Sequence, residues 1–371
     1  MDLKFTSEFS GLAYCLHPKN PSLFILSQQS DHLVILEVDL YTKTMCRSYY
    51  CPELHLDRSS KGRTECEKYF LFFLELKNQL MLVSPFGSIA FFDYESSALV
   101  TVIRLRGRHN HNVGTFCFHS GSDKLTLFYT AEGLKPIYVV TTLNFQGKLI
   151  QESKKRIQKL TNTVLQLGCH PTTNLLYGAC SDGCIHVWDY ELEKELTILI
   201  PDKSIPNKAV VGSCLNIDNR TKKLAHGNAY GYISVWDLNK VPEEHIEEFV
   251  VKLSFGVQAL SWLAIMHSDK YQYLLVTFSN GSLTMFKYIY GERKTKAKME
   301  EVCTLFQGEE NFPAPFNMDR TNFILTHPVL PFIASTWLKS KTEISFKSTI
   351  FLIYQGTSQG TEIAVLSPHN Q

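Results

Sequence analysis

Residues 181–189 read SDGCIHVWD and residues 229–237 read AYGYISVWD, so one short pattern returns after 48 residues. In each copy a turn of small or polar residues precedes a segment of alternating side-chain character, which is the period-2 signal of a β-strand. Glycine stands at the same place in both turns, at Gly183 and Gly231, and supplies the positive φ that a tight hairpin turn requires. The pattern therefore predicts a hairpin whose second strand ends in Trp-Asp.

Further copies of this unit occur along the chain, with successive spacings of 54, 96, 48 and 50 residues. The recognisable copies end at Asp39, Asp93, Asp189, Asp237 and Lys287. Because 96 is twice 48, a degenerate copy is expected inside the longest gap, and residues 134–150 (LKPIYVVTTLNFQGKLI) fit there. Residues 348–366 (STIFLIYQGTSQGTEIAVL) supply a last copy. The chain thus contains seven units of about fifty residues.

Each unit also contains an apolar stretch upstream of the turn, closed by His-Pro in three units, as in LGCHPTTNLLYGACS. A unit therefore reads as four short strands joined by turns, which is the strand count of one propeller blade. We predict an all-β, seven-bladed β-propeller of four-stranded antiparallel blades, forming one domain over residues 1–371. The expected blades span approximately residues 5–50, 68–106, 112–152, 160–202, 208–253, 256–308 and 320–367. The N-terminal strand, residues 1–6, is expected to close the ring beside residues 362–366.

The repeated motif residues are interpreted as structural, because a motif that recurs around a ring is expected to hold the strands of each blade together. The tryptophans are expected to fill the space between blades, and the aspartates to bond the backbone of the following turn. A chemical role is the alternative interpretation. The residues concerned are Asp93, Gly183, Trp188, Asp189, Gly231, Trp236, Asp237 and Gly281.

Charge and cysteine content exclude several classes of protein. The net charge is +1 with 20% charged residues, so no overall field recruits nucleic acid, and no nucleic-acid partner is expected. The ten cysteines are scattered without a CxxC pair, which favours buried reduced thiols over a disulfide framework or a zinc ribbon. The N-terminal sequence lacks a signal-peptide pattern, and no apolar run reaches the roughly 18 residues of a membrane span. We expect a soluble, cytoplasmic protein.

No motif predicts an enzyme, and we expect no catalytic residues, no cofactor and no metal. The sequence contains no GxSxG, P-loop, HExxH or GxGxxG pattern. His109 and His111 form a His-Asn-His string, but a second ligand pair at metal spacing is missing.

Three basic clusters are candidate contacts for phosphates or acidic peptides. They comprise Arg104, Arg106 and Arg108; Lys154, Lys155 and Arg156; and Arg293, Lys294 and Lys296. Solvated blade edges are the alternative interpretation of these basic residues. Two long polar loops, residues 51–68 and 288–320, are the best candidates for partner binding, and a short helix is expected over residues 294–305. A tolerated flexible insertion is the alternative interpretation of both loops.

The repeated turn-and-strand unit resembles the WD-repeat β-propeller family over nearly the whole chain, most strongly over residues 160–238. The resemblance implies a rigid platform that holds several protein partners on its rims. The Gly-His dipeptide that typically opens a repeat in this family is absent, so the family's His-centred hydrogen-bond network does not carry over. We therefore expect the blades to depend on apolar packing.

Three stretches carry a more specific resemblance. Residues 161–196 (TNTVLQLGCHPTTNLLYGACSDGCIHVWDYELEKEL), 227–238 (GNAYGYISVWDL) and 325–337 (LTHPVLPFIASTW) are similar to propellers of trafficking-coat subunits, namely the α and β′ coatomer proteins and the TSET/TPLATE tandem-propeller subunits. This resemblance implies a cytoplasmic scaffold that joins other subunits of a coat or adaptor complex. It also implies peripheral membrane association through weak contact with acidic lipids. A general adaptor in a soluble ribosome-maturation, ciliary or nuclear assembly is the alternative.

Overall fold

The computed structural model describes most of the first 306 residues and three short segments beyond them. The described residues are 11–29, 32–42, 44–51, 68–105, 113–121, 124–131, 137–145, 148–157, 162–201, 213–267, 269–291, 296–306, 324–326, 332–338 and 346–352. The chain divides into two compact units, one of residues 6–161 and one of residues 1–5 with 162–371.

The unit of residues 6–161 contains three four-stranded antiparallel sheets. The first sheet comprises β1 (Gly11–Leu16), β2 (Ser22–Gln29), β3 (His32–Asp39) and β4 (Met45–Cys51). The second comprises β5 (Phe70–Leu74), β6 (Gln79–Val83), β7 (Ser88–Asp93) and β8 (Leu99–Arg104), with the 3-10 turn η1 (Glu75–Lys77) after β5. The third comprises β9 (Val113–Ser120), β10 (Lys124–Ala131), β11 (Ile137–Phe145) and β12 (Lys148–Ile157). The degenerate copy predicted at residues 134–150 thus supplies β11 and the start of β12.

The other unit contains three four-stranded sheets and one sheet of three described strands. The fourth sheet comprises β13 (Val164–Cys169), β14 (Leu175–Cys180), β15 (Ile185–Asp189) and β16 (Lys194–Leu199). The fifth comprises β17 (Ser213–Ile217), β18 (Lys223–Asn228), β19 (Tyr232–Asp237) and β20 (Ile246–Lys252), with η2 (Pro242–Glu244) before β20. The sixth comprises β21 (Val257–His267), β22 (Tyr271–Phe278), β23 (Leu283–Ile289) and β24 (Lys298–Phe306). The last comprises β25 (Ile324–Thr326), β26 (Phe332–Leu338) and β27 (Phe346–Leu352).

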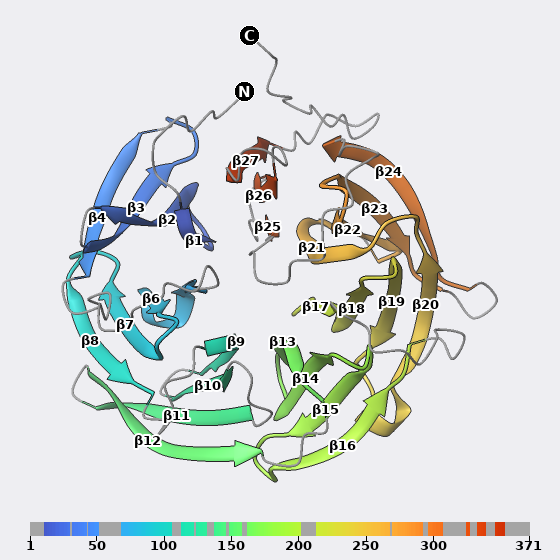
Figure 1. The fold of residues 1–371 in the computed structure, drawn as a ribbon, viewed down its shortest axis with the longest axis horizontal. Helices are drawn as coiled ribbons and strands as arrows, with labels where there is room; N and C mark the ends of the chain where they lie inside the picture. The colour runs from blue at the N-terminus through green and yellow to red at the C-terminus, as the bar shows by residue number, and fades with distance from the viewer. Residues whose placement is uncertain are drawn as a thin grey trace, which may run out of the picture. The chain divides into compact units, whose positions relative to one another are not determined.

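In every sheet the strands lie in chain order, and each strand pairs antiparallel with the strand before it. Figure 1 shows this order for β13 to β16. All residues of β14 are buried, whereas most of β16 is exposed or half-buried. Inner strands are therefore packed on both faces and the fourth strand forms the outer edge. This burial explains why the inner strands are apolar almost without interruption.

The two faces of the fourth sheet have different neighbours. Odd-numbered residues of β14 and β15 pack on the fifth sheet in one apolar cluster. That cluster contains Leu175, Tyr177, Ala179, Ile185, Val187, Leu199, Leu215, Leu224, Trp236 and Leu238. Because side chains alternate along a strand, Cys180, His186 and Trp188 project to the opposite face. The polar residues of the turn between β14 and β15 adjoin that face.

The short helix expected over residues 294–305 is wrong, because this segment contains β24. Its residues pair antiparallel with β23, from Lys298 opposite Ile289 to Phe306 opposite Leu283. The helix-forming Lys, Met and Glu side chains occupy an outer strand, where ladder hydrogen bonds outweigh local propensity. The two strands expected to close the ring, at residues 1–6 and 362–366, lie outside the described residues.

Candidate functional site

The Trp-Asp pairs close the third strands of the fourth and fifth sheets. Trp188 is fully buried and Trp236 nearly so. Asp189 Oδ1 accepts hydrogen bonds from the backbone N–H groups of Glu191 and Leu192, both at 2.9 Å. Asp237 Oδ1 accepts one from the backbone N–H of Asn239 at 3.0 Å, and Asp93 Oδ1 accepts one from Ser96 at 2.8 Å. These carboxylates bond the turn that follows each strand.

The turn glycines adopt the left-handed backbone that the hairpins require. Gly183, Gly231 and Gly281 have φ values of 80°, 83° and 83°. At Gly231 a Cβ atom would lie 2.5 Å from the carbonyl oxygen of Leu253 and 2.6 Å from that of Phe255. The turn between β18 and β19 therefore adjoins the segment that leads into β21.

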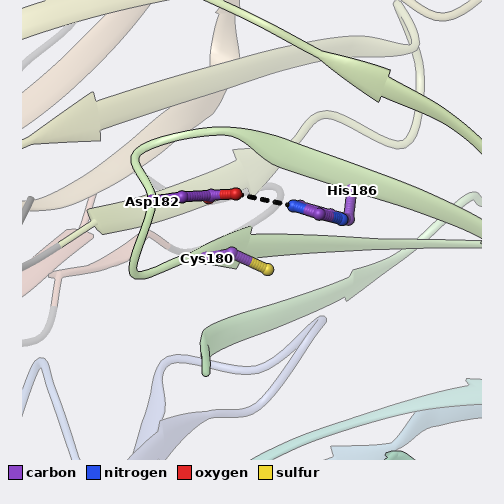
Figure 2. Close-up of side chains that lie close together, drawn as sticks. All are labelled: Cys180, Asp182 and His186. Carbon is purple, nitrogen blue, oxygen red and sulfur yellow. Dashed lines mark hydrogen bonds and ion pairs between the residues drawn. The ribbon is translucent and has the colours of Figure 1, made fainter. Parts of the chain in front are cut away.

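A compact group of metal-capable side chains surrounds the turn between β14 and β15. Cys180 ends β14, Asp182 lies in the turn and His186 lies on β15. Their sulfur, oxygen and nitrogen ligand atoms all lie within 4.8 Å of one another. Figure 2 shows the Asp182 carboxylate and the His186 ring pointing toward each other, with the Cys180 sulfur beside them. Cys, Asp and His together can hold a transition-metal ion.

His186 is held between two carboxylates. Its Nε2 lies 2.9 Å from Asp182 Oδ2, and its Nδ1 lies 2.5 Å from Glu195 Oε1 on β16. Asp182 is itself positioned by the Asn162 amide, which donates to Oδ2 at 2.6 Å, and by the Cys184 backbone N–H, which donates to Oδ1 at 3.0 Å. The ring orientation is therefore set from both sides.

The electrostatics of the group follow from burial and these contacts. Burial opposes the charged form of His186, but the hydrogen bonds and charges of Asp182 and Glu195 outweigh it, so the pKa of His186 is raised. Burial also opposes the charge of Asp182, yet the hydrogen bonds from His186 and the Cys184 backbone leave its pKa lowered. Burial raises the pKa of Cys180, and it raises the pKa of Cys184 to about 11. The raised pKa values of both thiols disfavour a nucleophilic cysteine.

The corresponding position of the fifth sheet has different chemistry. His226 on β18 is fully buried, and its Nε2 lies 2.6 Å from the Ser213 hydroxyl. Burial is the main cause that lowers its pKa, to about 4, so this imidazole is neutral near pH 7. The Trp236 indole N–H donates to Ser234 at 3.2 Å. In the fourth sheet the indole N–H of Trp188 has no hydrogen-bond partner among the described residues.

From sequence, the stretch that contains Cys180, Asp182 and His186 is interpreted as structural, and Cys180 with Cys184 lacks a second ligand pair at metal spacing. The signal that could have identified them is their place in the hairpin. Cys180 directly precedes the Ser-Asp-Gly turn and His186 is the third residue after it, and alternation along the two strands assigns both to one face. The resemblance also indicated that a His-centred network is absent, whereas the fourth sheet has one centred on His186 in the third strand.

The basic candidate contacts are described only in part. Arg104 ends β8 and Lys296 precedes β24, and both are exposed. Lys154, Lys155 and Arg156 lie on β12, opposite residues 138–140 of β11, and their side chains are not described. Arg106, Arg108, Arg293 and Lys294 lie outside the described residues, as do His109 and His111. Their roles stay predictions.

The two candidate partner loops also lie largely outside the described part of the chain. Residues 52–67 and 307–323 are not described. Within the ranges given above, the structure contains no helix long and apolar enough to cross a membrane.

Repeated four-stranded antiparallel sheets of this kind define the β-propeller class of folds. The β-propeller domain of Cps50 (Swd1) from Myceliophteria thermophila is similar, with a TM-score of 0.60 and 11% sequence identity. The superposition covers 94% of this chain and 98% of that chain. The prediction of an all-β propeller of antiparallel blades is confirmed, and the seven sheets agree with seven blades. No protein-family model matches the sequence, and no curated protein matches it.

Proposed function

We propose that this protein is a non-enzymatic scaffold that binds other proteins, as a subunit of a cytoplasmic membrane-trafficking coat or adaptor complex. The observation that carries the scaffold proposal is the exposure of large apolar side chains on turns that follow buried third strands. Leu192 and Val241 lie in the turns between the third and fourth strands of adjacent sheets, with 70% and 56% of their surfaces exposed. These side chains contribute little to the core and are available to a partner.

A second apolar spot lies at the opposite ends of the fifth-sheet strands. Tyr230 is 46% exposed in the turn between β18 and β19, and Phe255 is 37% exposed before β21. The two segments adjoin, because the backbone N–H of Leu253 donates to the carbonyl of Gly231 at 2.8 Å. Exposed aromatic side chains on two adjoining segments are the type of anchor that dominates protein interfaces.

The coat assignment rests on the resemblance of residues 161–238 to coat propellers, and on exposed basic residues such as Arg104 and Lys296. Basic side chains on a rim attract acidic lipid headgroups, and salt screens this attraction. The soluble-assembly adaptor is the competing function, and the same apolar turns support it equally.

Affinity purification of the full chain tests the scaffold proposal. We expect stable partner subunits to co-purify, and the double variant Tyr230→Ser/Phe255→Ser to lose them. The matched control is Val302→Ser, which removes a comparably exposed side chain, 41%, from the outer strand β24. Retention of every partner by the double variant would exclude this apolar spot as the docking surface.

Liposome sedimentation separates the coat from the soluble assembly. A coat subunit should co-purify with adaptor-like small and large subunits and pellet with acidic liposomes at low salt but not at high salt. The double variant Arg104→Ala/Lys296→Ala should pellet less. If the protein retains other partners but neither co-purifies with adaptor-like subunits nor pellets with acidic liposomes, the result contradicts the coat proposal and favours the soluble adaptor.

A further inference from the structure

The side chains around the turn between β14 and β15 have the composition of a zinc site. We propose that this turn binds one divalent transition-metal ion, with Zn²⁺ as the expected metal. Its protein ligands are the thiolate of Cys180, the carboxylate of Asp182 and Nε2 of His186. Mixed sulfur, nitrogen and oxygen ligands suit tetrahedral zinc. This site is additional to the scaffold function and does not depend on it.

The distances require only a small movement to close such a site. The three ligand atoms lie within 4.8 Å of one another, and Nε2 and Oδ2 are 2.9 Å apart. Ligands that sit about 2.0–2.3 Å from a tetrahedral zinc ion are roughly 3–4 Å from each other. The sulfur therefore has to approach the other two atoms by no more than about 1–2 Å.

Glu195 gives the histidine the second contact that metal-bound histidines usually have. His186 Nδ1 lies 2.5 Å from Glu195 Oε1, so in the tautomer with its proton on Nδ1 the ring donates to this carboxylate. A carboxylate at this position fixes the tautomer that exposes the Nε2 lone pair. That lone pair then faces Asp182 Oδ2, which is also an acceptor. Two acceptors at 2.9 Å need a cation between them, either a proton or a metal ion.

The carboxylate ligand is equally constrained. Asn162 donates to Oδ2 of Asp182 at 2.6 Å, and the backbone N–H of Cys184 donates to Oδ1 at 3.0 Å. These bonds hold the Asp182 side chain over the turn before any metal binds, so less conformational entropy is lost on binding. The site is therefore preorganised on the hairpin itself.

Cys184 lies beside the three ligands, but its sulfur is not among the ligand atoms that lie within 4.8 Å of one another, so a water molecule is the expected fourth ligand. The register Ala179–Ile185 continues to Cys180 and Cys184, and the backbone N–H of Cys180 donates to the carbonyl of Cys184 at 3.0 Å. Directly opposite residues of an antiparallel pair project to the same face. The half-buried Cys184 thus shares the face of Cys180 and His186. A bound ion would join both strands of the hairpin across its turn.

Metal content of the full-length, tag-free protein is the first test. After incubation with Zn²⁺ and exhaustive dialysis, we expect close to one zinc ion per chain. Replacement by Co²⁺ should produce visible ligand-field bands and a thiolate-to-cobalt charge-transfer band in the near ultraviolet, because a cysteine is a ligand. Wild-type protein that retains no zinc and shows no cobalt bands overturns the proposal and leaves a proton between His186 and Asp182.

Single substitutions assign the ligands. Cys180→Ser should abolish the charge-transfer band, and His186→Gln should reduce metal affinity by at least 100-fold. The control is Cys214→Ser, which removes a buried thiol from the fifth sheet and should leave the spectrum unchanged. Glu195→Gln should retain the spectrum with affinity reduced about 10–100-fold, as for a residue that contacts a ligand. A charge-transfer band that survives in folded Cys180→Ser, checked by circular dichroism, contradicts the assignment.

Discussion

In the fourth sheet Gly178 on β14 lies opposite His186 on β15, and in the fifth sheet His226 on β18 lies opposite Ser234 on β19. Both sheets therefore place one histidine in the same cross-strand pair, two residues before the tryptophan of the Trp-Asp motif. The histidine stands on the third strand in one sheet and on the second strand in the other. His186 is paired with carboxylates, whereas His226 bonds a hydroxyl.

This difference shows which part of the repeat is constrained and which part varies. The tryptophan is buried in both sheets, and the aspartate bonds the same turn in both. The cross-strand pair that contains the histidine varies, and each histidine has its own hydrogen-bond partners. In the fourth sheet the glycine leaves room for the tryptophan ring, since a Cβ at Gly178 would lie 2.7 Å from Trp188. The two sheets thus share the buried tryptophan and the turn bonded by the aspartate. They differ in the cross-strand pair that contains the histidine and in the turn beside it.

The largest predicted effect concerns the buried tryptophan that both sheets share. Trp188→Ala should lower the free energy of unfolding by about 3–5 kcal/mol, because it removes a fully buried indole beside a glycine that cannot fill the cavity. Urea unfolding followed by circular dichroism measures this change. Trp236→Ala should cost a similar amount. A loss below about 1 kcal/mol in either sheet would mean that the tryptophan is not part of a common packing frame.

The second effect is a pH dependence that differs between the two histidines. The pKa of His226, about 4, is below that of an unfolded histidine, so its contribution to stability is complete above about pH 6.5 and is lost as the pH falls toward 4. The full loss is on the order of 3 kcal/mol. The raised pKa of His186 acts in the opposite direction, because its contribution is present below about pH 6.5 and is lost as the pH rises through the raised pKa.

The free energy of unfolding of wild type and His226→Gln, compared at pH 7.5 and pH 4.5, measures the contribution of His226 to the pH dependence of stability. The acid-induced loss of stability should be smaller in the variant, because glutamine does not titrate. An equal loss in both proteins would show that His226 is not held neutral.

The third effect tests the tryptophan hydrogen bond that is present in the fifth sheet and, among the described residues, missing at Trp188 in the fourth. Ser234→Ala leaves the Trp236 indole N–H without its partner and should cost about 1–3 kcal/mol. Replacement of the tryptophan by phenylalanine in the same variant removes the orphaned donor, so the serine substitution should then cost less. If Ser234→Ala costs the same in both backgrounds, the hydrogen bond does not contribute to stability.

The smallest effect concerns the exposed turns of both sheets. Leu192→Ser and Val241→Ser should each change the free energy of unfolding by less than about 0.5 kcal/mol, because both side chains are mostly exposed. Thermal unfolding of the single variants is sufficient to detect a larger change. A loss of several kcal/mol would place these residues in the core and remove their surface from the proposed partner-binding turns.

The fold could be predicted from sequence because its signals are local and repeated. Alternation and the turn glycines identify strands such as β15 and β19, and the spacing of copies counts the sheets. The prediction failed at residues 294–305, since an outer strand with one exposed face accepts the polar helix formers Lys, Glu and Met. Local composition does not distinguish such a strand from a solvated helix.

The site could be predicted only in part. Cys180, Asp182 and His186 are close in sequence, and a hairpin around Ser-Asp-Gly brings them together. Glu195 could not be assigned in the same way, because the register between β15 and β16 shifts between Val187 and Trp188. After this shift Trp188, rather than its neighbour, lies opposite Glu195. The bulge depends on strand twist and on packing in three dimensions, and the sequence does not mark it.

Ring-nitrogen NMR of the two histidines tests the central comparison most directly. In metal-free protein the shifts should show that His186 stays protonated to a higher pH than a free histidine, and that the His226 ring stays neutral until the pH approaches 4. Assignment follows from the missing signal in His186→Gln and His226→Gln. Two rings that both titrate near pH 6.5 would contradict the account of the fourth and fifth sheets.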